Sequence, residues 1–473
     1  MAEIDKTPKQ IVSQLNEYVI GQNAAKKAVS IALRNRYRRL QLSPEMQTDI
    51  TPKNLLMIGP TGVGKTEIAR RLAKIVDAPF VKVEASKFTE VGYVGRDVES
   101  MIRDLVDVSV RMERKSQFKD VRVEAEKQAD NRLVKLLVPA VKQNTNQKQN
   151  GVDFQNLMSM VEKMQRGETP EYLTSQPEEI SDEVRDQRLS VSEQLKRGLL
   201  ENKEVTIAMD DPQQTPGMNN MMGQMGIDLG ESLGQMLPKK RIQRTMPVSE
   251  AREILVQEES DKLVNHGDLN HDAIKRAENT GIVFIDEIDK IIAKSQQNSG
   301  EVSREGVQRD ILPIVEGSQI NTKYGVINTD HILFIGSGAF QDSKPSDLIA
   351  ELQGRFPIRV ELNDLTKEDF VKILTEPNNA LVKQYIALIG TDNIKLTFTI
   401  EAINKIAEIA YNVNHETENI GARRLHTILE KLLEDILYEG ADMEMGDITI
   451  TEHYVEEKIG DIAGNKDLSQ YIL

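Results

Sequence analysis

Short apolar runs alternate with amphipathic stretches in the first part of the chain. Residues 54–58 form an apolar run that ends at a glycine, a pattern typical of a buried parallel strand. Residues 67–76 carry apolar side chains at helical spacing, and residues 80–83 return to a strand pattern. Strands and helices that alternate at this spacing predict an open, mostly parallel α/β sheet, with ligands bound at the carboxyl ends of its strands.

Similar patterns flank this region on both sides. Residues 8–35 predict two helices with a turn at Ile20 and Gly21, and the strand pattern resumes at 281–285 and 331–335. From residue 366 onward the chain is chiefly helical, and residues 448–450 predict one small strand. Its clearest element is an apolar stripe that must face a partner, formed by Leu425, Ile428, Leu429, Leu432, Leu433, Ile436 and Leu437.

The change in composition along the chain predicts three domains. Residues 112–270 are first charged and helical and then rich in Met, Gly and Gln, so they cannot bury much surface. We therefore expect an α/β nucleotide-binding domain over 1–111 and 271–360, and a helical inserted domain over 112–270 with a flexible middle. A small, mostly α domain is expected over 361–473.

Charge and composition narrow the class of protein. The 473 residues carry a formal charge of −15, which argues against nucleic acid as the default partner. The chain has no cysteine, so it can form neither a disulfide framework nor a cysteine-ligated zinc site. No apolar run reaches the roughly 18 residues of a membrane helix. We therefore expect a cytoplasmic protein without a membrane partner.

A phosphate-binding motif lies between the first predicted strand and helix. Residues 59–66 match G-x-x-x-x-G-K-[ST] in full, and this context is the one that the motif requires. Its glycines turn backbone N–H groups toward phosphates, Lys65 reaches the β and γ phosphates, and the Thr66 hydroxyl is offered to Mg²⁺. The predicted ATP-binding residues here are Gly62, Val63, Gly64, Lys65, Thr66 and Glu67.

Two adjacent acids follow the apolar run 281–285. In P-loop ATPases the acid at the strand end binds Mg²⁺ through its waters, and the next acid orients and deprotonates the attacking water. We assign Asp286 to the first role and Glu287 to the second. The alternative is a solvated turn or a helix N-terminus, where the helix dipole favours acids.

Four segments together resemble the AAA+ unfoldases of the Clp/Hsp100 class: residues 59–66, 283–290, 351–357 and 421–425. Within that class the chain is most similar to the HslU (ClpY) family, whose members serve the HslV peptidase. Residues 91–95 and 467–473 make the resemblance specific, and it is weakest in the insertion. It implies the AAA+ P-loop NTPase fold, with a helical insertion and a small C-terminal domain.

The resemblance also implies roles for several residues of the nucleotide site. Arg355 corresponds to an arginine finger that reaches the nucleotide of a neighbouring subunit, and Glu351 lies one helical turn earlier at the same shared site. Arg423 corresponds to the second sensor, with Arg424 as an alternative. The segment 19–22, which includes Ile20, is similar to the one that packs on adenine. Ser337 lies where the first sensor is expected, although serine is not the usual residue there, so its identity stays open.

Two further segments correspond to contacts with other proteins. Gly92, Tyr93, Val94 and Gly95 resemble the pore loop that grips substrate polypeptide, because an aromatic face needs no specific partner. The alternative is a hairpin turn whose tyrosine packs locally. The apolar C-terminus is similar to a tail that docks on the peptidase, through Leu468, Tyr471, Ile472 and Leu473.

The favoured hypothesis is a homo-hexameric ATPase that uses ATP and Mg²⁺ to unfold protein substrates and thread them into an HslV-type peptidase. The chain has no cysteine nucleophile, H-E-x-x-H or G-x-S-x-G motif, so it carries no recognisable peptidase of its own. Three alternatives are a ClpX-like unfoldase for a ClpP-type peptidase, a motor or clamp loader acting on nucleic acid, and a scaffold that binds ATP without hydrolysis. The chain lacks the zinc domain and the Ile-Gly-Phe loop of the first alternative. Its acidic charge argues against the second, and Glu287 with Arg355 argues against the third.

Overall fold

The computed structural model describes residues 6–89, 97–139, 182–210, 241–292, 304–442 and 446–460. The predicted pore loop at 92–95 and the predicted docking tail at 468–473 lie outside these residues. The chain divides into two compact units, one formed by Met1–Arg114 with His266–Leu473 and the other by Lys115–Asn265.

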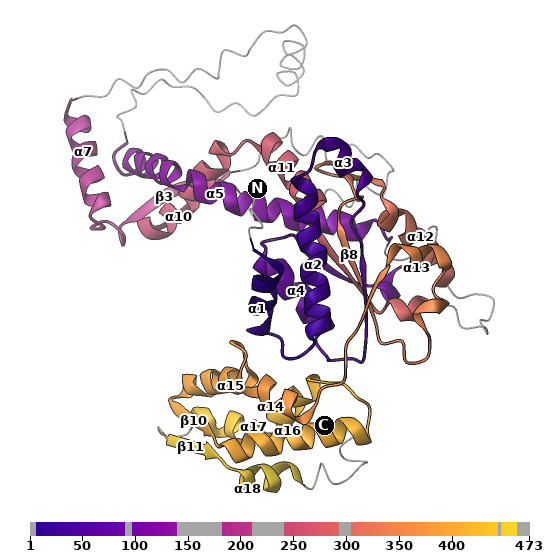
Figure 1. The fold of residues 1–473 in the computed structure, drawn as a ribbon. Coiled ribbons are helices and arrows are strands. Elements are labelled where there is room, and N and C mark those ends of the chain that lie inside the picture. The colour runs from indigo at the N-terminus through magenta and orange to yellow at the C-terminus, as the bar shows by residue number, and fades with distance from the viewer. Residues whose placement is uncertain are drawn as a thin grey trace, which may run out of the picture. The chain divides into compact units, whose positions relative to one another are not determined.

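A five-stranded parallel sheet forms the centre of the first unit (Figure 1). The strand order is β2-β5-β8-β1-β9, so strands distant in sequence are neighbours. The bounds are β1 Leu55–Ile58, β2 Phe80–Glu84, β5 Ile282–Asp286, β8 Leu333–Gly338 and β9 Ile358–Glu361. The central strands β1, β5 and β8 are almost wholly buried, as their continuous apolar sequences require. The prediction of a parallel α/β sheet is confirmed.

Helices surround this sheet and share its core. Their bounds are α1 Pro8–Asn16, α2 Asn23–Leu40, α3 Pro44–Asp49, α4 Lys65–Ile75, α11 His266–Thr280, α12 Arg304–Glu316 and α13 Ala350–Arg355. Short 3₁₀ turns are η1 Ala85–Lys87, η3 Ile288–Ile291 and η4 Pro345–Asp347, and a hairpin joins β6 Gln319–Thr322 to β7 Gly325–Asn328. Apolar side chains of α1, α2 and α4 pack in one core with those of β1, β5 and β8. Thr7 and Gln10 form a capping box that starts α1.

The C-terminal part of the first unit is chiefly helical. It contains α14 Lys367–Thr375, α15 Leu381–Ile389, α16 Ile400–Glu416, α17 Arg423–Glu439 and α18 Glu452–Val455, with η5 Gly390–Asp392, η6 Gly440–Asp442 and the single-turn π-helix η7 Glu456–Gly460. The strands β10 Ile394–Phe398 and β11 Gly446–Ile450 pair in parallel, which confirms the strand predicted at 448–450. Six of the seven residues of the predicted apolar stripe on α17 are buried. Leu437 is the exception, because it lies in the last turns of the helix at the edge of the stripe and is 39% exposed.

The second unit combines helices with one antiparallel hairpin. It contains most of the long helix α5 Ser100–Leu137, with α7 Asp182–Lys196 and α10 Val248–Leu263, and the hairpin strands β3 Glu204–Asp210 and β4 Arg241–Pro247. Residues of all these elements form one apolar core, which includes Leu133, Ile207 and Leu255. The hairpin was not predicted, although residues 204–209 alternate between polar and apolar side chains as a half-buried strand does. The boundaries 112 and 270 of the insertion stay a prediction.

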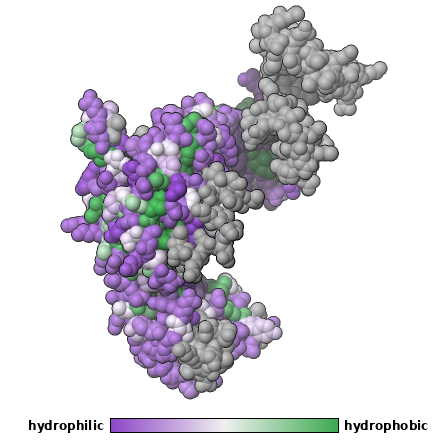
Figure 2. All heavy atoms as spheres, turned by 90° about the vertical axis from the view of Figure 1, so that its right-hand side faces the viewer, coloured by the Kyte–Doolittle hydropathy of each residue, from purple (hydrophilic) through white to green (hydrophobic). Residues whose placement is uncertain are grey.

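The surface in Figure 2 is mainly hydrophilic, and apolar side chains gather on it in a few separate patches. No helix among the described residues is both long enough and apolar enough to cross a membrane.

Candidate functional site

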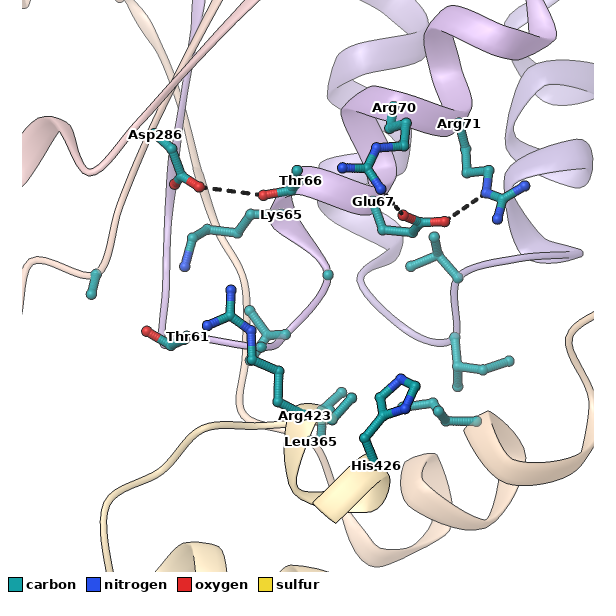
Figure 3. Close-up of a pocket in the computed structure, with 18 of the residues that line it drawn as sticks. Thr61, Lys65, Thr66, Glu67, Arg70, Arg71, Asp286, Leu365, Arg423 and His426 are labelled. Carbon is teal, nitrogen blue, oxygen red and sulfur yellow. Dashed lines mark hydrogen bonds and ion pairs between the residues drawn. The ribbon is translucent and has the colours of Figure 1, made fainter. Parts of the chain in front are cut away.

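A cavity of about 780 Å³ opens beside the phosphate-binding motif (Figure 3). Its lining includes the segment 18–20, the motif with the start of α4, the end of β5 and the start of α17. Lys82 of β2, residues at the end of β8 and residues of α14 and α15 also line it. Of the predicted site residues, it brings together Ile20, Gly62, Val63, Gly64, Lys65, Thr66, Glu67, Asp286, Glu287 and Arg423. Residues from distant parts of the sequence thus line one space.

The loop before α4 has the backbone geometry that phosphate binding needs. Gly62 and Gly64 have φ values of +77° and +103°, which side chains with a Cβ rarely adopt. Gly64 caps α4 directly, so the free N–H groups of the helix start face the cavity. The loop is therefore suited to an anion by its amides and by the helix dipole.

Lys65 lies deep in this loop. Its Nζ donates to the carbonyl oxygens of Gly59 at 2.5 Å and Pro60 at 2.7 Å. Burial lowers the pKa of Lys65, while the carboxylates of Asp286 and Asp289 counteract that shift. The nearby guanidinium of Arg423 lowers the pKa slightly further. An incoming polyphosphate would therefore meet two converging positive groups, as Figure 3 also shows.

Asp286 ends β5 with both carboxylate oxygens engaged. Oδ1 accepts hydrogen bonds from the Ser337 hydroxyl at 3.0 Å and from the Glu287 backbone N–H at 3.1 Å. Oδ2 lies 2.8 Å from Nζ of Lys82 and accepts from the Thr66 hydroxyl at 3.5 Å. Burial alone would raise the pKa of Asp286, but Lys82, Ser337 and the Glu287 N–H outweigh it and lower the pKa. Asp286 is therefore an anion at neutral pH.

Glu287 has a backbone conformation that is uncommon for a residue with a side chain. Its φ of +56° lies in the left-handed region, at the point where β5 passes into η3. Oε2 accepts a hydrogen bond from the Ser86 hydroxyl at 2.7 Å, and the residue lines the cavity. The two adjacent acids thus have different partners, since Asp286 faces Thr66 and Lys82 while Glu287 faces η1. Strain of this kind is often kept at functional positions.

The segment 18–22 closes another side of the cavity. Nζ of Lys26 donates to the Val19 carbonyl at 2.5 Å and to Oδ1 of Asn16 at 2.7 Å. The side-chain amide of Gln22 donates to the Asn363 carbonyl at 2.8 Å and accepts from the Asn363 N–H at 3.2 Å. These bonds hold an apolar wall, which contains Val19 and Ile20, against the cavity.

The start of α17 distinguishes two neighbouring arginines. Arg423 is exposed and lines the cavity, and Figure 3 shows its guanidinium pointing toward the phosphate-binding loop. Arg424 is 4% exposed and donates to Asn414, Thr417 and the Glu418 carbonyl. Arg424 therefore holds the local fold, and Arg423 is the arginine available to a ligand.

Arg355 and Glu351 are not part of this lining. Both lie on the short helix α13, where Nε of Arg355 donates to Oε1 of Glu316 at 2.9 Å. The side chain of Arg355 is 45% exposed. The structure of one chain therefore leaves these two residues apart from Lys65, Asp286 and Arg423.

Lys82 and His426 are among the lining residues that were not predicted from the sequence. Lys82 forms the ion pair with Asp286, and His426 lines the cavity one turn after Arg423 on α17 (Figure 3). No motif marks either residue. Lys82 has a weak signal, because it is a charged side chain within a predicted strand whose neighbour in the sheet ends in an acid.

Three family models match the chain. They describe an AAA domain of the Cdc48 subfamily at residues 202–359, the ATPase family associated with various cellular activities at 55–189, and the C-terminal D2-small domain of ClpB at 365–442. They support nucleotide binding and ATP hydrolysis by an AAA+ fold.

Full-length relatives extend this result over the whole chain. Proteins named ATP-dependent protease ATPase subunit HslU are 76% identical in Lactiplantibacillus plantarum, 70% in Ligilactobacillus salivarius and 65% in Enterococcus faecalis. Each alignment covers 100% of this chain and 100% of the relative. The chain therefore belongs to the HslU family of AAA+ ATPases.

Proposed function

We propose that this chain is the ATPase subunit of a two-component protease, in which a homo-hexameric ring unfolds protein substrates and passes them to an HslV-type peptidase. The observation that carries the proposal is the convergence of Lys65, Asp286, Glu287 and Arg423 on one cavity. The names of the relatives support the protease partner, since each is an ATPase subunit of an ATP-dependent protease. Nothing in the described residues favours nucleic acid or a ClpP-type peptidase.

Each group of cavity residues has a separate role in the proposed ATP hydrolysis. The amides of the loop and Nζ of Lys65 bind the phosphates. The Thr66 hydroxyl and Oδ2 of Asp286 approach within 3.5 Å, and hard oxygen donors of this kind fit Mg²⁺. When bound there, Mg²⁺ would neutralise the charge of the β and γ phosphates. Glu287, freed from Ser86, accepts the proton of the attacking water through Oε2.

The remaining predicted residues act between molecules in this proposal. Arg355 and Glu351 contribute to the nucleotide site of the neighbouring subunit, which agrees with their exclusion from the cavity of their own chain. A shared site of this type requires a closed heterologous ring. Tyr93 would grip the substrate, and the tail that ends in Ile472 and Leu473 would dock on the peptidase.

The proposal is tested by mixing the protein and ATP with an HslV-type or a ClpP-type peptidase and measuring peptide cleavage. We expect activation of the HslV-type enzyme alone. Activation of the ClpP-type enzyme alone, or of neither, would contradict the proposed partner. Glu287→Gln is the control for hydrolysis, since it should bind ATP but lose turnover by at least about 100-fold. Salt-dependent DNA binding by the same preparation would instead favour a nucleic-acid motor.

A further inference from the structure

Gln308 is a buried polar residue on α12 whose side chain joins two separate backbone segments. It is 1% exposed. Its Nε2 donates to the Ile291 carbonyl at 2.8 Å, and its Oε1 accepts from the Ile349 N–H at 2.9 Å. The amide nitrogen and the amide oxygen are therefore both satisfied by backbone groups.

The two segments that Gln308 joins carry the residues proposed for hydrolysis. Ile291 ends η3, the turn that begins directly after Asp286 and Glu287. Ile349 is the N-cap of α13, the helix that carries Glu351 and Arg355. The side chain of Gln308 thus links the turn beside the acids of one nucleotide site to the helix proposed to serve the next.

A second contact connects the same helix pair. Glu316, the last residue of α12, accepts from Nε of Arg355 at 2.9 Å and lies 2.8 Å from its Nη2. Helix α12 therefore contacts α13 at both ends, through Gln308 at the N-cap residue Ile349 and through Glu316 at the last residue, Arg355. Figure 1 shows the two helices side by side.

We propose that Gln308 is a positioning residue that couples the turn after Asp286 and Glu287 to the placement of Arg355. The inference rests on the proposed function, because it assumes that Arg355 acts on the neighbouring nucleotide. Through Gln308, the turn after the acids of one subunit would influence the position of Arg355, which the same subunit contributes to the neighbouring nucleotide site.

The burial of Gln308 makes this link stiff. If η3 or α13 moved alone, either the Ile291 carbonyl or the Ile349 N–H would lose its partner inside the protein. Leaving a buried donor or acceptor without a partner is unfavourable, because its hydrogen bond to water is lost and not replaced. The two hydrogen bonds therefore oppose movement of one segment without the other, so a displacement of the turn favours a displacement of α13 and of Arg355.

A double-mutant cycle between Gln308→Met and Arg355→Ala tests the link in the full-length protein. Methionine matches the length of glutamine but makes neither hydrogen bond. We expect Gln308→Met alone to lower kcat for ATP roughly 10-fold or more, because a small misplacement of a catalytic group is enough for such a loss. KM, the Kd for ADP and the size of the assembly should stay close to the wild-type values, since the residue does not line the cavity.

In the Arg355→Ala background, Gln308→Met should change kcat by less than about twofold, because the two residues act as one unit. Additive losses would overturn the role of Gln308 while leaving the role of Arg355 intact. If Arg355→Ala itself retains normal kcat, then the proposed action of Arg355 fails, and the role of Gln308 fails with it.

The matched control is Ile311→Val on the same helix. Ile311 is fully buried, and removal of one methyl group should lower the stability while both hydrogen bonds of Gln308 stay in place. If this variant loses kcat as Gln308→Met does, the effect of Gln308 is one of stability alone and the proposal is wrong. If Gln308→Met does not fold, Gln308→Glu takes its place in the cycle, because it keeps the acceptor for Ile349 and loses the donor to Ile291.

Discussion

The hydroxyl of Ser337 donates a hydrogen bond to Oδ1 of Asp286 across 3.0 Å. The strands β8 and β5 are parallel neighbours, so their carboxyl ends meet at one edge of the sheet. Ser337 is fully buried there, and its hydroxyl holds one oxygen of the carboxylate while the other faces the cavity. The sequence left the identity of the first sensor open, and this contact favours Ser337.

Ser337→Ala should therefore reduce ATP turnover by roughly 10-fold, because Asp286 loses a donor that fixes its orientation. The free energy of unfolding should fall by only about 1 kcal/mol. Steady-state hydrolysis and thermal unfolding measure the two effects. Ser109→Ala is the matched control, since Ser109 is equally buried and donates to the Ala273 carbonyl away from the cavity. Equal turnover in the two variants would exclude a role for Ser337 in hydrolysis.

Lys82 is expected to compete with Mg²⁺ for Asp286. Its Nζ lies 2.8 Å from Oδ2, the oxygen that faces Thr66. Lys82→Met removes this cation. The Mg²⁺ concentration that gives half-maximal binding of a fluorescent ADP analogue should therefore fall by about tenfold, equivalent to about 1.4 kcal/mol. A titration of Mg²⁺ into the protein with this analogue measures that concentration. Lys87→Met is the control, because Lys87 pairs with Glu84 instead. A requirement for Mg²⁺ that is unchanged or higher in Lys82→Met would contradict the competition.

The parts predicted well from the sequence depend on local patterns. The motif ending at Lys65 and Thr66 lies within eight consecutive residues, and Asp286 follows its strand directly. Short, mostly apolar runs were enough to predict β1, β2, β5 and β8, which are four of the five strands of the parallel sheet. Each of these features is encoded by neighbours in the chain, so no knowledge of the tertiary structure was needed.

The parts that were missed depend on contacts between distant residues. The pairing of Lys82 with Asp286 exists only because β2 and β5 are neighbours in the sheet. Gln308 acquires its two partners from segments 17 and 41 residues away. Arg423 and Arg424 are adjacent in a helix, and only their packing shows which of them faces the cavity.

The stability of the protein should depend on pH through Lys26. Burial lowers the pKa of Lys26 to about 8, whereas the unfolded chain keeps the usual value near 10.5. Between these values the unfolded state holds a proton that the folded state has released, so the contribution of this group to stability rises with pH. From pH 7 to pH 9.5 the gain is about 2 kcal/mol.

Lys26→Met lacks this gain, so its stability relative to the wild type should fall further at pH 9.5 than at pH 7. Thermal unfolding at the two pH values measures the difference. Lys27→Met is the control, because Lys27 is exposed on the same helix. The difference in stability between this variant and the wild type should be the same at both pH values. If the difference in stability between Lys26→Met and the wild type narrows as the pH rises, the pKa of Lys26 is not lowered in the folded protein.

The two arginines at the start of α17 should give opposite results. Arg423→Ala should lower turnover by at least about 10-fold with little change in stability, because the side chain lines the cavity and is exposed. Arg424→Ala should destabilise the protein by about 2–4 kcal/mol, because it removes the donor to the Glu418 carbonyl and one of the two donors to Oδ1 of Asn414. Hydrolysis assays and thermal unfolding separate the effects. The reverse result would assign the nucleotide contact to Arg424.

Gly421 should be sensitive to substitution because it packs against the phosphate-binding loop. The Ala422 N–H donates to the Gly62 carbonyl at 3.1 Å, and a Cβ on Gly421 would lie 2.7 Å from the carbonyl oxygens of Gly62 and Thr61. Gly421→Ala must therefore displace the loop or the start of α17. We expect the Kd for ADP to rise by about 10-fold or more, since the loop amides would no longer converge on the phosphates.

Gly198→Ala separates this contact from backbone strain. Gly198 has a φ of +70°, close to the +59° of Gly421, but a Cβ there would meet nothing within 4 Å. Both substitutions should therefore cost about 1 kcal/mol from strain, while only Gly421→Ala should weaken nucleotide binding. Fluorescent ADP titration and thermal unfolding of both variants measure the two effects. If both variants bind ADP as the wild type does, the contact between Gly421 and Gly62 does not shape the nucleotide site.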